Sequence, residues 1–243
     1  MRPMRIAVVS DLHGNLFALE AVVADLATQA PELVLHGGDL ATAGPRPAEV
    51  VDRVRGLGWP GVRGNTDEVP YTEQVEREVR AGAPKLARWL DAMFGTLGPW
   101  SAERLGPERQ RWLHMLPDRH EEDSLRLVHA TPGSLWRAPM PDASPDELEA
   151  AYAELGGALT VYGHIHRPFV APRRQGLVAN SGSAGAPWDG DQRASYLVID
   201  EGTPHVRRVG YDVDAAVRDA REVGFPLADW LGAVYTTGTF TAP

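Results

Sequence analysis

Side chains that can bind metal ions close several short apolar runs of this chain. The residues at the ends of these runs are Asp11, Asp39, Asn65, His129 and His164. His13 follows Asp11, and His166 follows His164, at a spacing of two, at which side chains of an extended segment point the same way. A mixture of imidazole nitrogens with carboxylate and amide oxygens suits Mn, Fe, Co, Ni or Zn better than Ca or a purely soft site.

The number of these candidate ligands predicts two ions rather than one. Seven ligands are too many for one tetrahedral ion, and Asp39 is the natural bridge because a carboxylate can use one oxygen for each metal. Two ions at ~3.5–4 Å can hold a shared hydroxide and clamp the oxygens of an in-line displacement. Two divalent ions outweigh two carboxylates and one hydroxide, so the pocket would attract a phosphate group.

Each motif by itself has a simpler interpretation. Asp11 could cap the following helix, Gly38-Asp39 and Gly64-Asn65 could be ordinary turns, and His129 could be a packed core histidine. Their common position at strand ends favours the metal centre over these separate interpretations. Glycines precede the ligands at positions 37, 38, 64 and 163, where we expect sharp turns or a backbone that passes close to an ion.

Alternating strands and helices are predicted to position these residues. Apolar patterns predict strands at 5–10, 33–35 and 61–63, and helices at 16–27 and 49–57. This alternation is typical of βαβ units in a largely parallel sheet. Strands at 125–128 and 159–162 and a helix at 146–155 continue the pattern. Since open α/β sheets place their sites beyond the carboxyl ends of strands, the candidate ligands should meet at one edge.

The remaining segments follow other patterns. Residues 69–118 hold three tryptophans, many charges and helical periodicity, which predicts a helical insertion that forms a lid over the metal edge and sets substrate size. Residues 176–179, 196–199 and 205–209 read as hairpin strands with a turn at 200–202. A last helix is expected at 214–223, and the tail after Tyr235 is expected to fray.

Composition limits the class of protein. The 243 residues suit one domain, and the 43% of hydrophobic residues can build a sizeable core. The absence of cysteine excludes thiolate sites and disulfides. Neither a membrane span nor a signal peptide is expected, which makes the cytoplasm the default compartment. A net charge of -9 argues against nucleic-acid coating and membrane-surface binding, and the oligomeric state stays open.

The ordered blocks resemble those of the calcineurin-like metallophosphoesterases. The matching blocks are Asp11-Leu-His13-Gly-Asn15, Gly38-Asp39, Gly64-Asn65, His129 and Gly163-His164-Ile-His166. Gly44-Pro45-Arg46, the segment 180–191 and the ending after Tyr211 are similar to small bacterial phosphodiesterase-like members. The resemblance covers nearly the whole chain and is weakest at 69–118. It implies an α/β fold, a four-layer αββα sandwich of two mixed sheets, forming a single domain with the helical insertion.

The resemblance also implies roles for individual residues. One metal would be held by Asp11, His13, Asp39 and His166, and the other by Asp39, Asn65, His129 and His164. Manganese is the expected metal, with Fe, Ni, Co or Zn as alternatives. Asp39, Asn65 and Asp67 are the predicted catalytic residues. Asn15 and Arg46 are the predicted substrate contacts, although Asn15 could instead cap a helix. Arg137 and Arg167 could also touch phosphate, but each of the three arginines could instead be solvated or paired.

Two departures from the family pattern bear on the reaction. Many relatives carry His after the Asn of the third block, where this chain has Thr66 and Asp67. Thr66 cannot donate a proton as a histidine can, and a carboxyl near two cations is a poor acid. The phosphoprotein phosphatases carry Asp-Arg shortly after the second-block Asp, where this chain has Thr42-Ala43.

The predicted activity is hydrolysis of small phosphodiesters or phosphomonoesters, including nucleotides, by a hydroxide shared between two metals. A dinucleoside polyphosphate hydrolase differs only in substrate. A phosphoprotein phosphatase is disfavoured by Thr42-Ala43 and Thr66. A non-catalytic interaction scaffold is a further alternative, but this chain keeps every ligand.

Overall fold

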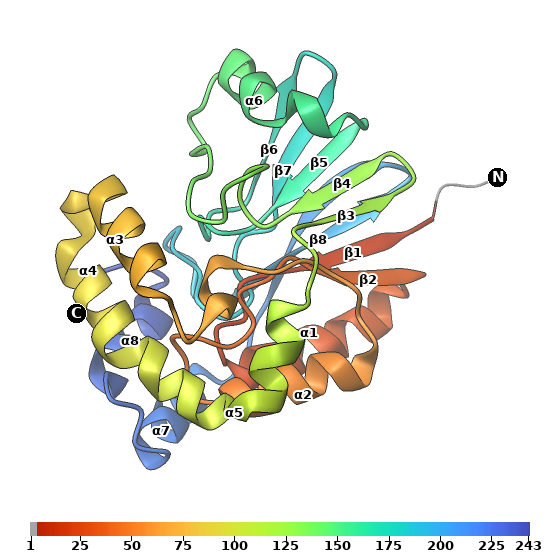
Figure 1. Cartoon of the computed structure of the whole chain (residues 1–243). Coiled ribbons are helices and arrows are strands. Elements are labelled where there is room, and N and C mark those ends of the chain that lie inside the picture. Colours follow the sequence, from red (N-terminus) through yellow and green to blue (C-terminus); the bar gives the residue numbers. More distant parts are fainter. Residues whose placement is uncertain (1–3) are drawn as a thin grey trace.

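Two β-sheets packed face to face form the centre of the molecule (Figure 1), as seen in a computed structural model that describes residues 4–243. The first sheet has the order β2 (Leu33–His36), β1 (Ile6–Val9), β8 (Ala194–Asp200) and β9 (Thr203–Val209). Strands β1 and β2 are parallel, whereas β8 runs antiparallel to both β1 and β9. The sheet is therefore mixed, not largely parallel as the alternation alone predicted.

The second sheet is also mixed. Its order is β3 (Arg119–Glu122), β4 (Leu125–Val128), β5 (Leu159–Tyr162), β7 (Gly176–Asn180) and β6 (Phe169–Arg173). Strands β4, β5 and β7 are parallel, and the two edge strands are antiparallel to their neighbours. The expected hairpin of 196–199 and 205–209 is present as β8 and β9, but 176–179 lies in the other sheet as β7.

The core lies between the sheets and on their outer faces. Residues of β1 alternate between the two: Ile6 and Val8 face the second sheet, while Ala7 and Val9 face helices. The outer layer on the first sheet is made of α1 (Leu16–Gln29), α2 (Pro47–Leu57) and α5 (Gly98–His114). Helix α6 (Pro145–Tyr152) and the short turn Ala153–Leu155 cover the second sheet. The expected four-layer αββα sandwich is confirmed.

Local sequence accounts for the helix boundaries and the hairpin turn. Asn15 caps α1 by accepting a hydrogen bond from the amide of Ala18, and Ser144 forms a capping box with Glu147 at the start of α6. Glu201 and Gly202 have φ of 48° and 79°, which is the left-handed backbone that a two-residue hairpin turn requires.

The segment 69–118 divides into two parts. Helix α3 (Glu73–Gly82), a short turn at Pro84–Leu86, α4 (Ala87–Ala92) and a π-helical turn at Met93–Leu97 lie beyond the carboxyl ends of the strands (Figure 1). Helix α5 instead returns to α2, where Leu105 and Leu113 are buried in the outer core. Only the first part, residues 73–97, therefore has the position expected of a lid, and it is called the lid below.

Several boundaries differ from the expectations. Residues 61–63 form no strand, only a bridge between Gly61 and His36, since the chain turns at once into the short helix Asn65–Glu68. Strands β3 and β6 lack clear apolar runs. Helix α7 (Val213–Glu222) lies as expected, and α8 (Ala228–Thr237) extends beyond the point where fraying was expected. In the described part of the chain, no helix has the length and apolarity that crossing a membrane requires.

Candidate metal centre

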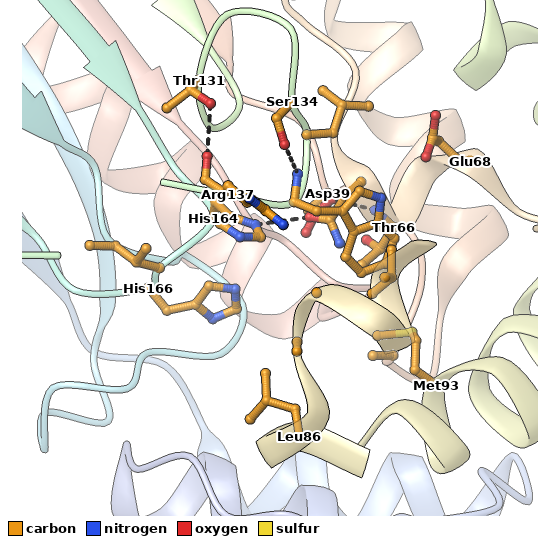
Figure 2. Close-up of a pocket in the computed structure, with 18 of the residues that line it drawn as sticks. Asp39, Thr66, Glu68, Leu86, Met93, Thr131, Ser134, Arg137, His164 and His166 are labelled. Atoms are coloured by element: carbon orange, nitrogen blue, oxygen red, sulfur yellow. Dashed lines mark hydrogen bonds between the residues drawn. The ribbon is translucent and has the colours of Figure 1, made fainter. Parts of the chain in front are cut away.

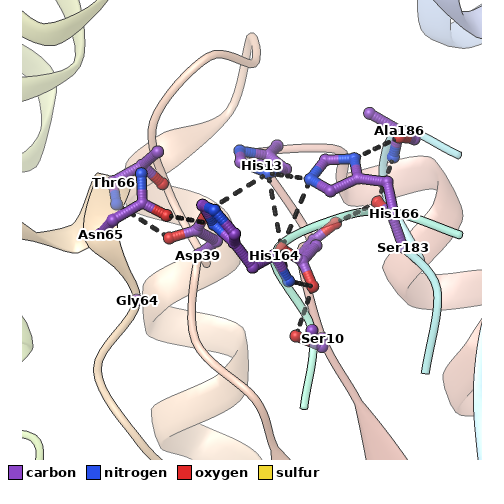
Figure 3. A network of polar contacts seen from close by, with 12 residues as sticks. Ser10, His13, Asp39, Gly64, Asn65, Thr66, His164, His166, Ser183 and Ala186 are labelled. Carbon is purple, nitrogen blue, oxygen red and sulfur yellow. Dashed lines mark hydrogen bonds and ion pairs between the residues drawn. The ribbon is translucent and has the colours of Figure 1, made fainter. Parts of the chain in front are cut away.

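The ligand candidates meet at one edge of the two sheets. Asp11 follows β1 and Asp39 follows β2 in the first sheet, while His129 follows β4 and His164 follows β5 in the second. Asn65 begins the short helix that leads toward the lid. Figure 3 shows residues of both sheets with their polar groups turned toward a common centre. The site is thus built across the two sheets, and each sheet contributes ligand candidates.

One half of the centre is formed by His13 and His166. Their Nε2 atoms lie 3.1 Å apart. Each Nδ1 lies within hydrogen-bonding distance of a carbonyl, Thr42 at 2.7 Å for His13 and Ala186 at 2.5 Å for His166. A nitrogen that faces a carbonyl carries the ring proton, so both Nε2 atoms present lone pairs. Two lone pairs at this distance repel each other unless a cation lies between them, and this half therefore fits a metal ion.

The other half is formed by His129, Asn65 and His164. His129 directs Nδ1 to the carbonyl of Gly37 at 2.8 Å, which leaves its Nε2 as an acceptor that faces Asn65 Oδ1 at 2.9 Å. His164 Nδ1 approaches the same amide oxygen at 3.0 Å. The lone pairs of His129 Nε2 and Asn65 Oδ1 again face each other, so a second cation fits here.

Asp39 lies between the two halves. Its Oδ2 is 3.6 Å from His13 Nε2 and 3.5 Å from His129 Nε2. Its Oδ1 accepts a hydrogen bond from the amide of Thr66 at 2.8 Å. The geometry differs from the expectation of one oxygen for each metal, because a single oxygen faces both halves and the other is held by the backbone.

Asp11 completes the first half. Its Oδ1 lies 3.3 Å from His166 Nε2 and 4.0 Å from His13 Nε2, while the hydroxyl of Ser10 donates to Oδ2 at 2.5 Å. Ligands bound at about 2.0–2.2 Å to one ion lie roughly 3–4 Å apart. The ligand atoms of Asp11, His13 and His166, and those of Asp11, Asp39 and His129, lie within 4.8 Å of one another. These separations match two adjacent ions.

The backbone at the ligands is unusual. Asp11, His13, Asp39, His164 and His166 all have positive φ, between 46° and 65°. This left-handed conformation is unfavourable for residues with side chains and is tolerated where surrounding structure enforces it. Among the glycines that precede the ligands, Gly38 has the positive φ of the expected turn, at 86°. Gly64 and Gly163 have a different role: a Cβ on Gly64 would lie 2.0 Å from Asp39 Oδ1, and one on Gly163 2.3 Å from Asp11 Oδ2. They make room for ligand carboxylates rather than for an ion.

Burial and mutual charge shift the protonation of the site. Burial raises the pKa of Asp11, but the imidazole of His166 outweighs it, and the net pKa is well below its usual range. Burial lowers the pKa of His13, against the attraction of Asp39. Burial and the charge of His129 lower the pKa of His164 to about 4. Burial lowers the pKa of His129, but the carboxylates of Asp39 and Asp11 outweigh it, and the net pKa is raised. Metal ligation requires ionised carboxylates and neutral histidines, so a metal ion that binds here competes with a proton on His129.

Asp67 lies beneath the site and does not line the cavity. Its Oδ2 accepts from the amides of Asp39 at 2.8 Å and Gly64 at 2.9 Å, and its Oδ1 accepts from the amide of Leu40 at 2.9 Å. It is fully buried, and burial together with the charge of Asp39 raises its pKa to about 6. The prediction that Asp67 is catalytic is not supported by this position, because both oxygens are held by backbone amides.

The two predicted substrate contacts are also engaged elsewhere. Asn15 caps α1 and donates to the carbonyl of Gly185 at 2.8 Å. Arg46 forms an ion pair with Asp219 on α7, with Nε 3.0 Å from Oδ2, and a second with Glu49 at 3.0 Å. Neither residue lines the cavity beside the metal ligands. The structure therefore corrects both assignments in favour of the alternatives, a helix cap and a paired arginine.

A cavity of about 890 Å³ opens beside the ligands, between the lid and the loop after β4 (Figure 2). His13, Asp39, Asn65, His164 and His166 lie at its floor. Its walls are largely apolar and include Leu86, Trp89 and Met93 of the lid, Trp136 and Met140 of the β4–α6 loop, and Trp188, Trp230 and Phe240 of the C-terminal part. A cavity of this size with apolar walls can hold a small molecule that has an apolar part.

Sequence reasoning missed two contributors to the cavity. Trp188 stacks on His166 with ring centroids 3.8 Å apart, so it fixes the orientation of a ligand candidate and walls the cavity. Phe240 packs against Trp188 at 4.7 Å although it lies in the tail that was expected to fray. The Pro187-Trp188 pair within the glycine-rich segment was a signal for the first, but no pattern singled out the second.

Comparison with known proteins assigns the family. A model of the calcineurin-like phosphoesterase superfamily domain matches residues 4–203, and the chain belongs to this superfamily of phosphoesterases. An uncharacterized protein of Methanocaldococcus jannaschii is 30% identical, with 93% of this chain and 95% of the relative aligned. The crystal structure of a metallophosphoesterase from Sphaerobacter thermophilus is similar, with 26% identity, a TM-score of 0.77, and coverage of 97% of this chain and 99% of that one.

A hypothetical protein from Pyrococcus horikoshii has the same fold. Its structure matches with 21% identity and a TM-score of 0.77, and 98% of this chain and 99% of that chain are covered. Like the Sphaerobacter structure, it corresponds to this chain over nearly its full length, so the fold of the described residues is shared and not only the sheets that carry the ligand candidates.

Proposed function

We propose that this protein hydrolyses phosphodiester or phosphomonoester bonds at a dinuclear metal centre. One ion would be held by Asp11, His13, Asp39 and His166, and the other by Asp39, Asn65, His129 and His164. The observation that carries the proposal is the set of lone pairs that face one another, His13 with His166 and His129 with Asn65, with Asp39 Oδ2 about equally far from both halves.

Two bound divalent ions, for which manganese is our first choice, would supply an activated water and neutralise phosphate charge. The chain's own residues prepare that chemistry. Thr42, Gly37 and Ala186 fix the histidine tautomers through their carbonyls, so that the lone pairs face inward. The amide of Thr66 fixes one oxygen of Asp39 and leaves the other for both ions.

The cavity walls support an organic group beyond the phosphate. The lid contributes Leu86 and the opposite loop contributes Met140, two apolar side chains that are exposed yet line the same cavity. We propose that the lid sets the size of the organic group. Nucleotides and dinucleoside polyphosphates stay candidates because half-buried tryptophans line the walls, and a phosphoprotein phosphatase is disfavoured because the cavity is flanked by apolar groups on both sides.

The test is metal content together with turnover. Purified protein is stripped with a chelator, reloaded with Mn²⁺, and assayed by metal analysis and with bis(4-nitrophenyl) phosphate, 4-nitrophenyl phosphate and a nucleotide panel. We expect two ions for each chain and metal-dependent hydrolysis. Asp39→Ala should lose activity and at least one ion.

Two outcomes would reject the proposal. One is a protein that binds a single ion, or none, at saturating Mn²⁺. The other is a two-ion protein that turns over no ester in the panel, which would favour the scaffold alternative. Arg174→Gln, on the exposed turn between β6 and β7 and away from the cavity, serves as the matched control and should retain both ions and activity.

A further inference from the structure

Four arginines line the cavity beside the metal ligands, and their guanidinium groups differ in what they contact. Arg63 pairs with Asp118 at 2.6 Å, and Arg119 pairs with Glu121 at 3.7 Å. Arg167 donates from Nε to the carbonyl of Trp188 at 3.2 Å. The guanidinium of Arg137 makes no ion pair or hydrogen bond with any group in residues 4–243. It is an exposed charged group of the cavity that no carboxylate of the described residues neutralises.

The backbone that carries Arg137 is held in place. Thr131 and Ser134 exchange two backbone hydrogen bonds of 3.1 Å, which close the turn at the start of the loop. The hydroxyl of Thr131 donates to the carbonyl of Arg137 at 2.9 Å. Trp136, the preceding residue, packs against Tyr71 and against Phe94 of the lid, each 6.1 Å away. An ordered loop therefore carries a solvent-exposed cation that has no partner among residues 4–243.

The side chain reaches across the cavity to the lid. A Cβ on Gly82, the last residue of α3, would lie 3.1 Å from Arg137 Nη2, so the guanidinium passes close to the end of this helix. Figure 2 shows Arg137 among the residues that line the cavity together with His164 and Asp39. The guanidinium therefore lies on the lid side of the cavity whose floor holds the metal-ligand candidates.

We propose that Arg137 binds the phosphate group of the substrate opposite the metal ions. This inference rests on the proposed phosphoesterase function and replaces Arg46 as the phosphate-binding arginine. A guanidinium presents two parallel N–H donors that match two phosphate oxygens, and it remains charged at all working pH values. Arg137 also supplies positive charge that the chain does not compensate, which fits an anionic ligand.

A competing role is that of a counter-ion for the acidic ligand cluster. That role requires an ion pair with Asp11 or Asp39, and none is present: Asp39 directs Oδ1 to the amide of Thr66, and Asp11 directs Oδ2 to Ser10. The two roles differ in their consequence. Loss of a counter-ion changes metal affinity, whereas loss of a phosphate-binding group changes phosphate affinity at unchanged metal content.

The test measures binding of inorganic phosphate, as product and substrate fragment, to the Mn²⁺-loaded protein by titration calorimetry, with metal content determined on the same samples. Arg137→Ala should bind phosphate about 10- to 100-fold more weakly, the range expected for loss of charge-assisted hydrogen bonds. Arg137→Lys, which keeps the charge without the two-pronged geometry, should fall between this variant and the wild type. Both should retain two ions and the wild-type melting temperature, because the guanidinium has no partner in the chain.

Arg119→Ala is the matched control, since it removes the same charge from the same cavity but from an arginine that has a carboxylate partner. It should bind phosphate within about twofold of the wild type. Equal phosphate affinity of Arg137→Ala and wild type would overturn the proposal, as would a loss confined to metal content. Wild-type protein that binds no phosphate also overturns it. Wild-type protein that binds phosphate but hydrolyses no ester refutes the phosphoesterase function and leaves the Arg137 site standing.

Discussion

Asp67 distinguishes a structural role from a catalytic one. The sequence placed this carboxylate next to a metal ligand as a catalytic residue, whereas the structure gives it three backbone donors, the amides of Asp39, Leu40 and Gly64. Hydrogen bonds to a charged group contribute about 1.5–3 kcal/mol each. Removal of all three by Asp67→Ala should therefore lower the free energy of unfolding by roughly 4–9 kcal/mol, which is comparable to the whole stability of an ordinary domain.

Asp67→Asn is the more informative variant because it keeps the shape of the side chain. The asparagine side chain keeps one oxygen that can accept a hydrogen bond. Its NH2 group replaces the other oxygen, and there a donor faces the backbone amide that donated to the carboxylate. In the wild type, the amides of Asp39 and Gly64 donate to one carboxylate oxygen and the amide of Leu40 donates to the other. The asparagine can therefore keep either the first two hydrogen bonds or the third, but not all three. We expect a loss of about 2–4 kcal/mol. We also expect weaker Mn²⁺ binding, since the amide of Asp39 loses its restraint.

Urea unfolding of the metal-free and Mn²⁺-loaded forms measures both effects. Asp200→Asn is a suitable control, because it breaks an ion pair with Arg5 that is partly exposed and should cost about 0–1 kcal/mol. The opposite outcome has a clear signature. If Asp67→Asn unfolds at the same urea concentration as the wild type and instead loses one limb of its pH–rate profile, Asp67 is an acid–base catalyst and the structural interpretation is wrong.

Two further predictions concern the leaving group and acid stability. Thr66 lines the cavity at the position where the resembled family often has His. Without that acid, the enzyme should favour aryl over alkyl phosphate esters, with a ratio of kcat/KM values ~10²–10⁴-fold larger than in an enzyme that has the histidine. Thr66→Val should leave this ratio unchanged, and similar kcat/KM for both esters with chemistry rate-limiting would contradict the prediction. Burial and the nearby His120 lower the pKa of His36 to about 3. The unfolded chain therefore takes up a proton that the folded chain refuses, and stability should fall by roughly 3–5 kcal/mol as pH drops from 6.5 to 3. His36→Leu should flatten this dependence in chemical unfolding measured across that range, and an unchanged slope would mean that other groups dominate.

The metal edge was predictable because two independent patterns agree. Each apolar run marks a strand, and each ligand candidate follows the run by at most a few residues, so topology brings Asp11, Asp39, His129 and His164 to one edge without knowledge of the strand order. His13 and His166 also reach the site, but not through the extended geometry on which their prediction rested, because these two residues and their partners Asp11 and His164 all have positive φ. Asn65 is an instructive exception, since its run forms only a bridge yet the residue reaches the site.

The support around the ligands was not predictable from spacing. Asp67, Asn15 and Arg46 stand near the ligand blocks in sequence, but their side chains point to backbone amides, a helix end and Asp219. The backbone φ of neighbouring residues decides whether a polar side chain faces the cavity or the loop beneath the cavity. The spacing of residues in the sequence does not reveal that angle. Trp188 was hidden for the converse reason, because it lies in a segment whose fold is set by long-range packing. Arg137 was one of three arginines that could touch phosphate, and the sequence alone did not distinguish it from Arg46 and Arg167.

The strained backbone at the ligands is held by hydrogen bonds within the protein. Left-handed φ at non-glycine residues costs about 1–3 kcal/mol each, and five ligand candidates carry it. The loops that hold them are joined by backbone hydrogen bonds that need no ion: Asp11 donates to Gly38 at 3.0 Å, His13 to Asp39 at 3.0 Å, and Gly163 to His129 at 3.0 Å. These bonds link the loops within each sheet, and the amide of His164 donates to Asp11 across the two sheets. A centre restrained in this way positions the ligands through the fold, so metal affinity should depend on the restraining groups as well as on the ligands themselves.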